Sequence, residues 1–173
     1  ARDIMLAAIL GAGPVADAFF VALRLPNHFR AIFAEGAFNA AFVPAYARLH
    51  GKGEASARLF ADRIFTLLFV AQVILLVMAW VFMPEVIAIL APGFKDDPAR
   101  GELAISLTRI TFPYLLLITL VTLYGGMLNV MHRFASAAAA PIFLNLSMMA
   151  TLALAAFFPG AGYAAAWGVL LAG

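Results

Sequence analysis

The residues best able to do chemistry are concentrated near the start of the chain, in otherwise apolar sequence. Three arginines and three carboxylates lie there: Arg2, Asp3, Asp17, Arg24, Arg30 and Glu35. An ionisable side chain at membrane depth costs at least about 2.5–3.5 kcal/mol, and such groups usually face a bundle interior or a wet cavity. A guanidinium fork matches phosphate oxygens better than the point charge of a lysine does. These residues therefore predict a hydrated pocket that binds an anion.

Helical geometry divides this group of charges. On one straight helix, Asp17, Arg24 and Glu35 fall within about 20° of one another, because seven and eighteen residues nearly complete whole turns. Arg30 falls about 140° away on the same helix. We therefore expect Asp17, Arg24 and Glu35, together with Asp3, to balance the charge of the pocket.

Pro26 lies inside the same apolar stretch and is followed by Asn27. Its ring removes a backbone donor and clashes with the preceding turn. Broken helices at membrane depth are tolerated mainly where they line a cavity. We expect a kink or local unwinding between about residues 23 and 29, with Asn27 turned toward the pocket.

A structural interpretation of the same charges stays open. Arg2, Arg30 and Glu35 would then lie near helix ends and extend to lipid headgroups, or pair off with neighbours. The two interpretations differ in where the charges point. A binding site predicts that they converge inside the bundle, and a structural role predicts that they lie at helix ends.

Other chemistry finds little support in the sequence. His28, His50 and His132 are far apart and have no metal-ligand spacing, and no phosphate-binding loop of the G-x-x-x-x-G-K-[ST] type is present. Asn145 and Ser147 favour hydrogen bonds between helices. No nucleophile and base can be paired. We therefore expect no metal, no cofactor, no nucleic-acid partner and no enzymatic activity.

Composition identifies the class of protein. Of 173 residues, 65% are hydrophobic and 12% are charged, whereas soluble domains are nearer half apolar and a quarter charged. Three stretches lack any charge: residues 64–84, 110–131 and 134–173. The first two approach the roughly 20 residues that a helix needs to cross a hydrocarbon core, and the third is long enough for two helices. The absence of ten-residue alternation argues against a barrel. The sequence predicts an integral membrane protein of helices.

The expected elements form an all-α transmembrane bundle with no soluble domain. Helices are predicted over about residues 1–10, 16–47, 61–90, 103–130, 141–158 and 163–173. Breaker clusters at residues 11–14 and 91–93 mark turns. The first and last helices look incomplete, so the chain is expected to be a piece of a longer protein.

The placement of lysine and arginine predicts the orientation. Five of them lie in the loops near residues 47–63 and 132–140, and two lie between residues 95 and 100, where acidic residues dilute them. Short cytoplasmic loops carry the excess of positive charge. The loops near 47–63 and 132–140 are therefore predicted to be cytoplasmic.

Several segments resemble a known family. "ARDIMLAAILGAG", "ADAFFVALRLPN" and "FRAIFAEGAFNAAFVPAYA" resemble the start of the MurJ (MviN) family of bacterial lipid II flippases, in the multidrug/oligosaccharidyl-lipid/polysaccharide exporter superfamily. "APGF", "ITFPYLLLITL", "GGMLNV" and "RFASAAAAPIFLNLSMM" resemble the third to fifth helices of that family. The resemblance covers essentially the whole chain and is most specific in residues 1–46.

The resemblance implies the N-terminal lobe of a MATE-like, two-lobed transporter of the bacterial inner membrane, with a central cationic cavity. Its partners would be the missing C-terminal lobe, membrane lipids and lipid II, the undecaprenyl-pyrophosphate-linked precursor of peptidoglycan. Arg2 and Arg30 match arginines regarded as essential for the substrate. Asp3, Asp17 and Asn27 match polar cavity positions, and Glu35 matches the acid of "AEGAF".

Two alternatives remain beside a lipid II flippase. One is an exporter of another lipid-linked oligosaccharide or of a drug. The other is a membrane scaffold for cell-wall synthesis that transports nothing. An exporter of cationic drugs would need acidic cavity walls, so the arginines argue against it. Arg109 is unusual for the family and has no assigned role.

Overall fold

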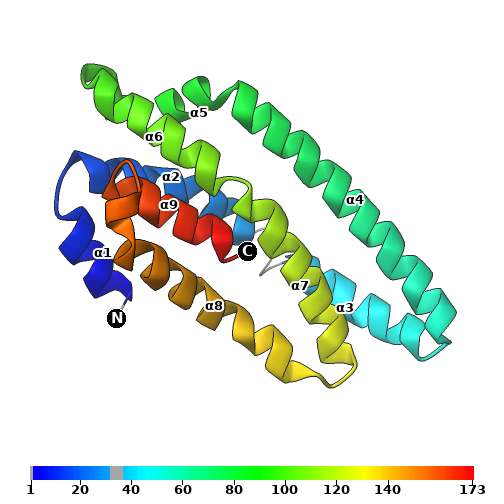
Figure 1. Ribbon diagram of the computed structural model, residues 1–173. Helices are drawn as coiled ribbons and strands as arrows, with labels where there is room; N and C mark the ends of the chain where they lie inside the picture. The colour runs from blue at the N-terminus through cyan, green and yellow to red at the C-terminus, as the bar shows by residue number, and fades with distance from the viewer. Residues whose placement is uncertain (1, 32–36) are drawn as a thin grey trace.

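The computed structural model describes residues 2–31 and 37–173, and this part of the chain is helical without strands. The longer elements are α1 (Arg2–Leu10), α2 (Pro14–Arg30), α3 (Ala37–His50), α4 (Glu54–Val81), α6 (Pro98–Thr111), α7 (Tyr114–Val130), α8 (Phe134–Ala153) and α9 (Ala161–Leu171). Three short elements complete the order: α5 (Met83–Leu90) and the 3₁₀ helices η2 (Pro92–Asp96) and η3 (Ala155–Phe157). Figure 1 shows an elongated helical bundle.

Glycine and proline set the turn between α1 and α2, as predicted. Gly11 has φ +67°, in the left-handed region that residues with a Cβ rarely adopt. Pro14 begins α2, where its missing N–H has no intrahelical partner to lose. The two helices are thereby joined by a short connection.

The second predicted helix, over residues 16–47, corresponds to α2, which ends at Arg30, and α3, which begins at Ala37. Residues 32–36 of that range lie outside the described residues. A kink or local unwinding was expected between about residues 23 and 29; the unwinding is not observed, because α2 is α-helical on both sides of Pro26, and the kink stays a prediction. Thr111 of α6 donates a hydrogen bond to the carbonyl of Ala22, the group that Pro26 cannot serve.

Two other predicted helices are broken at prolines. The range predicted over residues 61–90 begins earlier, at Glu54, and divides into α4 and α5 at Phe82, two residues before Pro84. The range predicted over 103–130 begins at Pro98 and divides into α6 and α7 at residues 112 and 113. A proline has no N–H to continue the hydrogen-bond ladder of a helix, so both helices are interrupted close to a proline.

The last two predicted helices also differ in their bounds. The range 141–158 is covered by α8, which begins at Phe134, and by η3. The range 163–173 corresponds to α9, which begins at Ala161 and ends at Leu171. Alanine-rich sequence before Pro141 continues the helix toward its N-terminus because alanine has the highest helix propensity.

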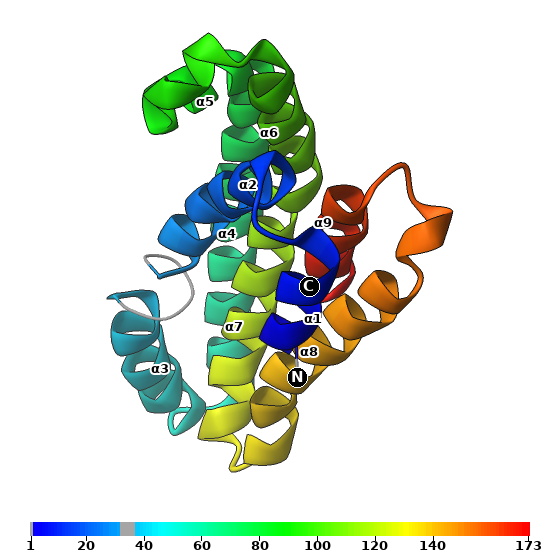
Figure 2. The same ribbon diagram turned by 90° about the vertical axis from the view of Figure 1, so that its left-hand side faces the viewer.

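Packing divides the bundle into two apolar clusters. The larger one draws residues from every described α-helix except α3, and includes Phe19, Leu107, Leu115 and Leu152, each at most 1% exposed. The smaller one joins α3, α4 and α7 around Phe42. Figures 1 and 2 show α2 and α9 beside α6 at one end, and α3 beside α7 at the other.

Helix α4 is the element most exposed to its surroundings. It has 28 residues, and only 11% of its most apolar window is buried inside the molecule. Leu67, Ile74 and Val81 recur at seven-residue spacing and are each more than half exposed. A long apolar helix with so little protein around it fits a lipid-facing span.

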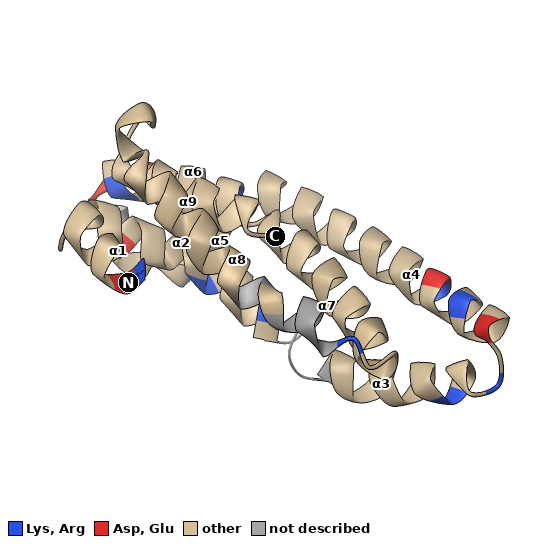
Figure 3. Cartoon of the chain, turned by 60° about the horizontal axis from the view of Figure 1, so that its bottom comes forward, with Lys and Arg blue, Asp and Glu red and all other residues tan. Residues whose placement is uncertain are grey.

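The turns gather at the two ends of the bundle. The α3–α4 and α7–α8 turns lie at one end, and the start of α6 and the α1–α2 turn lie toward the other. In Figure 3 the middle of α4 is free of charge, while charged residues mark its start. The two loops predicted to share one side of a membrane therefore share one end of the molecule.

Candidate functional site

A cavity of about 240 Å³ lies where α1, α2, α7, α8 and α9 meet. Its lining residues are Arg2, Asp3, Leu6, Phe20, Leu23, Asn27, Arg30, Tyr114, Leu144, Met148 and Val169. The polar groups come from α1, α2 and α7, and the apolar groups from all five helices except α7. The two arginines predicted to bind an anion therefore share one cavity.

One face of α2 supplies much of this cavity. Phe20, Leu23, Asn27 and Arg30 are spaced by three, four and three residues, so they fall within about 80° on a helix. Asn27 lies about 20 Å along α2 from Pro14, well inside the thickness of a hydrocarbon core. The expected orientation of Asn27 toward the pocket is confirmed, although the helix around it stays wound.

Arg2 and Asp3 form an ion pair at the rim of the cavity. Nε and Nη2 of Arg2 donate to Oδ1 of Asp3 at 3.0 and 2.8 Å. The Arg2 side chain is 32% exposed and that of Asp3 is 81% exposed. The pair leaves Arg2 oriented and still accessible. With Arg30, the described residues of the lining include two guanidinium groups and one carboxylate.

Asp17 and Arg24 lie outside this cavity, which corrects the expected grouping on α2. They sit about 80–100° from the middle of the lining face, because the helix turns 100° per residue. Oδ2 of Asp17 lies 3.5 Å from Nη1 of Arg100, at the start of α6. Arg24 is exposed and does not line the pocket. Glu35, the third predicted member of that face, lies outside the described residues.

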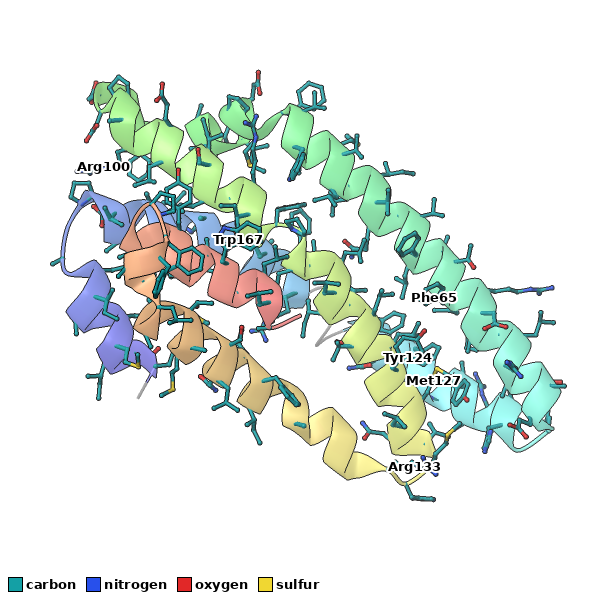
Figure 4. The ribbon with its side chains drawn as sticks, in the orientation of Figure 1. Phe65, Arg100, Tyr124, Met127, Arg133 and Trp167 are labelled. Atoms are coloured by element: carbon teal, nitrogen blue, oxygen red, sulfur yellow. The ribbon has the colours of Figure 1, made fainter. Side chains whose placement is uncertain are left out.

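Arg100 belongs to a separate polar group near the α1–α2 turn. Its Nε lies 3.4 Å from Oδ2 of Asp97, and its guanidinium lies 5.6 Å from the ring centroid of Phe94. Figure 4 places Arg100 beside the start of α2, far from Arg133 at the α7–α8 turn. This group joins η2, α6 and α2, and it provides Asp17 with its ion-pair partner, Arg100.

A second hollow, of about 310 Å³, adjoins the first along α1 and α2. The two share Asp3, Leu6 and Phe20, and the second adds Ala7, Leu10, Gly11 and Ala16. Beyond Asp3 its side chains are apolar. A polar cavity with an apolar extension suits an amphipathic ligand that has a charged head group.

Comparison with known proteins identifies the family. A family model described as "Lipid II flippase MurJ" matches residues 6–173. The chain belongs to the MurJ family of lipid II flippases. A relative in Rhizobium meliloti named "Probable lipid II flippase MurJ" is 45% identical over 99% of this chain and 33% of the relative. The "Lipid II flippase MurJ" of Burkholderia cenocepacia is 37% identical over 100% of this chain and 34% of its own length.

A solved structure supports the same fold. It is described as "Lipid II flippase MurJ, inward closed conformation", and it matches with a TM-score of 0.78 and 24% sequence identity over 99% of this chain. That match covers 36% of the solved chain. The chain thus spans about a third of the MurJ relatives that it matches. It is a membrane protein, and its helices match part of the fold of a longer MurJ chain.

The MurJ-family chain has pocket residues that sequence reasoning missed. Tyr114 of α7 is 4% exposed and lines the cavity, as do Leu144 and Met148 of α8. The signal for Tyr114 was Pro113, because a break before a polar aromatic residue redirects that residue. Among the described residues no group of three or more potential metal ligands is found.

Proposed function

We propose that the whole protein moves lipid II across the bacterial inner membrane, and that the cavity lined by Arg2 and Arg30 holds the pyrophosphate group. The observation that carries this proposal is the meeting of Arg2 and Arg30 in one cavity, from two different helices. Family membership supports the substrate class. The apolar hollow next to the cavity suits the first part of a prenyl chain.

The physical problem is the charge of the head group. A pyrophosphate cannot enter the hydrocarbon core unshielded, so the path must supply positive charge and water while the prenyl tail stays in lipid. Arg2 and Arg30 supply that charge, and Asn27 adds neutral hydrogen-bonding groups. Asp3 orients Arg2 and offsets part of the positive charge when the cavity is empty.

Alternating access completes the cycle. The lobe that contains these helices rocks against the second lobe, so the cavity opens first to one side of the membrane and then to the other. No bond in the substrate is made or broken. The membrane potential is worth about 2.3 kcal/mol per charge per 100 mV, enough to bias such a step.

The test replaces the cavity arginines in the full-length protein. Arg30→Ala, Arg2→Ala and Arg30→Lys should each impair growth of a flippase-depleted bacterium at normal membrane abundance. Arg30→Lys should fail nearly as badly as Arg30→Ala because a lysine lacks the planar fork. Arg24→Ala is the matched control, since Arg24 is on the same helix and outside the cavity.

The outcome separates the alternatives. Normal growth with both Arg2→Ala and Arg30→Ala would show that these arginines do not bind substrate. Purified protein that binds another lipid-linked oligosaccharide but not lipid II would indicate a different exporter. Growth that depends on the protein's presence but not on any cavity residue would favour a scaffold.

A further inference from the structure

Three of the prolines in this bundle, Pro26, Pro84 and Pro113, each leave one backbone carbonyl without its regular helical donor. In an α-helix the N–H of each residue donates to the carbonyl four residues earlier, and proline has no N–H. Pro26, Pro84 and Pro113 therefore cannot serve the carbonyls of Ala22, Trp80 and Arg109 respectively. In a lipid environment such a group must find a partner within the protein.

Three side chains donate to these carbonyls: Thr111 and Arg109 from the last turn of α6, and Trp80 from α4. Oγ1 of Thr111 donates to the carbonyl of Ala22 at 3.0 Å. Nη2 of Arg109 donates to the carbonyl of Trp80 at 3.4 Å, and Nε1 of Trp80 donates to the carbonyl of Arg109 at 3.2 Å. The last two bonds are reciprocal, because the side chain of each residue donates to the backbone carbonyl of the other.

These bonds bring three helices to one level of the bundle. Thr111 links α6 to α2, and the Trp80–Arg109 pair links α6 to α4. Thr111 is fully buried, and its hydroxyl also lies 3.3 Å from the carbonyl of Thr108 in its own helix, the longer of its two contacts. Figures 1 and 2 show the α6–α7 junction beside α2.

Two of these prolines immediately precede residues that line the cavity. Pro26 immediately precedes Asn27, and Arg30 lies one turn further along α2. Pro113 immediately precedes Tyr114, which lines the cavity from α7. We propose that the last turn of α6 positions the binding site: Thr111 keeps α2 helical through Pro26, and the Trp80–Arg109 pair fixes the break that directs Tyr114. This assignment of positioning residues rests on the proposed function of the cavity.

Amide hydrogen exchange of the purified full-length protein tests the first half directly. Thr111→Val removes the donor and keeps the shape, so exchange in residues 23–31 should become about threefold to tenfold faster, as expected for one lost hydrogen bond. Thr108→Val is the matched control, because the Thr108 hydroxyl is equally buried and bonds the carbonyl of Ala104 in its own helix at 2.6 Å. Equal effects of the two substitutions would overturn the proposal.

The same substitution in a Pro26→Ala variant tests whether Thr111 acts through the carbonyl of Ala22. In that variant the new N–H of residue 26 donates to this carbonyl, so Thr111→Val should no longer accelerate exchange in residues 23–31. The loss of side-chain volume at residue 26 does not affect this comparison, because Pro26→Ala is present in both of the variants compared. An undiminished effect of Thr111→Val in that background would show that Thr111 does not act through Pro26.

The reciprocal pair is tested by crossed substitutions and thermal unfolding of the same protein. Trp80→Phe should lower the unfolding temperature, and Pro113→Ala should remove that effect because residue 113 then donates to the carbonyl of Arg109. Pro84→Ala should not remove it, since Pro84 affects only the carbonyl of Trp80. Arg109→Ala should show the converse pattern. Simple additivity in all combinations would contradict the reciprocal assignment.

Binding separates the positioning role from the proposed function. Thr111→Val should weaken binding of undecaprenyl pyrophosphate to the full-length protein about threefold to tenfold, and Thr108→Val should not. If Arg30→Ala abolishes binding and Thr111→Val leaves it unchanged, the positioning role is wrong. If Arg30→Ala itself binds normally, the proposed function of the cavity fails. In that case the positioning role falls with it, and the exchange experiment decides only whether Thr111 keeps α2 helical through Pro26.

Discussion

At the scale of single residues, arginines of one chain serve different purposes because their neighbours differ. Arg30 faces a cavity with Arg2, whereas Arg100 lies between Asp17 and Asp97 and stacks on Phe94. Both side chains are partly buried. The arrangement around Arg100 offsets its positive charge with two carboxylates of the protein.

Gly168 shows how close packing limits single positions. A Cβ at this residue of α9 would lie 2.9 Å from the Cα of Met148 in α8. The Ser147 hydroxyl donates to the Gly168 carbonyl at 2.9 Å, so the two helices meet here. Gly168→Ala should destabilise the protein by about 1–3 kcal/mol, as overpacking does. Thermal unfolding of the purified full-length protein measures this.

Gly101 provides the control for that substitution. It lies within α6, and its added Cβ would be 3.7 Å from the nearest atom, the carbonyl oxygen of Phe94. Gly101→Ala should leave stability unchanged or raise it, because alanine is favoured over glycine in helices by about 0.5–1 kcal/mol. A loss with Gly101→Ala as large as that with Gly168→Ala would contradict the packing argument.

At the scale of elements, polar side chains join helices whose outer faces are apolar. Gln72 is the buried polar residue of α4, and its Nε2 donates to Oγ1 of Thr119 in α7 at 3.2 Å. The Thr119 hydroxyl in turn donates to the carbonyl of Leu115 at 2.7 Å. Hydrogen bonds between helices hold membrane bundles together where lipid supplies no hydrophobic driving force.

Because Gln72 is the donor and Thr119 the acceptor, substituting the two residues should lower stability by unequal amounts. Thr119→Val leaves the buried amide of Gln72 without its acceptor, so it should cost about 0.5–2 kcal/mol of stability. Gln72→Leu should cost less, because Thr119 keeps its bond to Leu115. The double variant should be more stable than Thr119→Val alone, as measured by thermal unfolding.

Thr122→Val is the control for the element-scale prediction. The Thr122 hydroxyl bonds the carbonyl of Ile118 within α7 at 2.8 Å, so its loss affects one helix only. This variant should be close to native in stability. Equal losses for Gln72→Leu and Thr119→Val would show that the hydrogen bond is not asymmetric in the way its geometry indicates.

At the scale of the whole molecule, charge and exposed apolar surface define a direction. The α3–α4 and α7–α8 turns, which contain Lys52 and Arg133, lie at one end of the bundle. Between the two ends, α4 exposes an uncharged apolar surface along its length. A membrane plane across the bundle leaves both basic turns on one side.

Thiol labelling of intact cells tests the orientation. In a cysteine-free full-length protein, Asp96→Cys should react with an impermeant reagent added outside, and Lys52→Cys should react only after the cells are opened. Both positions are exposed, so accessibility within the protein is matched. External labelling of residue 52 would reverse the orientation proposed from the loop charges.

The sequence by itself determined the class of structure and much of the candidate site. Uncharged stretches of about twenty residues require helices in lipid, because backbone groups there must bond within their own segment. Residue type singled out the charged residues of this region and Asn27, since such groups are costly in apolar stretches unless they face a cavity, and the family resemblance distinguished Arg2 and Arg30 among them. The motifs that these residues belong to identified the family.

Tertiary structure decided which of the polar residues meet. Asp17 pairs with Arg100, and Tyr114 enters the cavity, because helices far apart in the chain pack side by side. The α-helical conformation around Pro26 could not be predicted from the local sequence either. The donor to the Ala22 carbonyl is Thr111, 89 residues further along the chain. A local sequence pattern contains no information about so distant a donor.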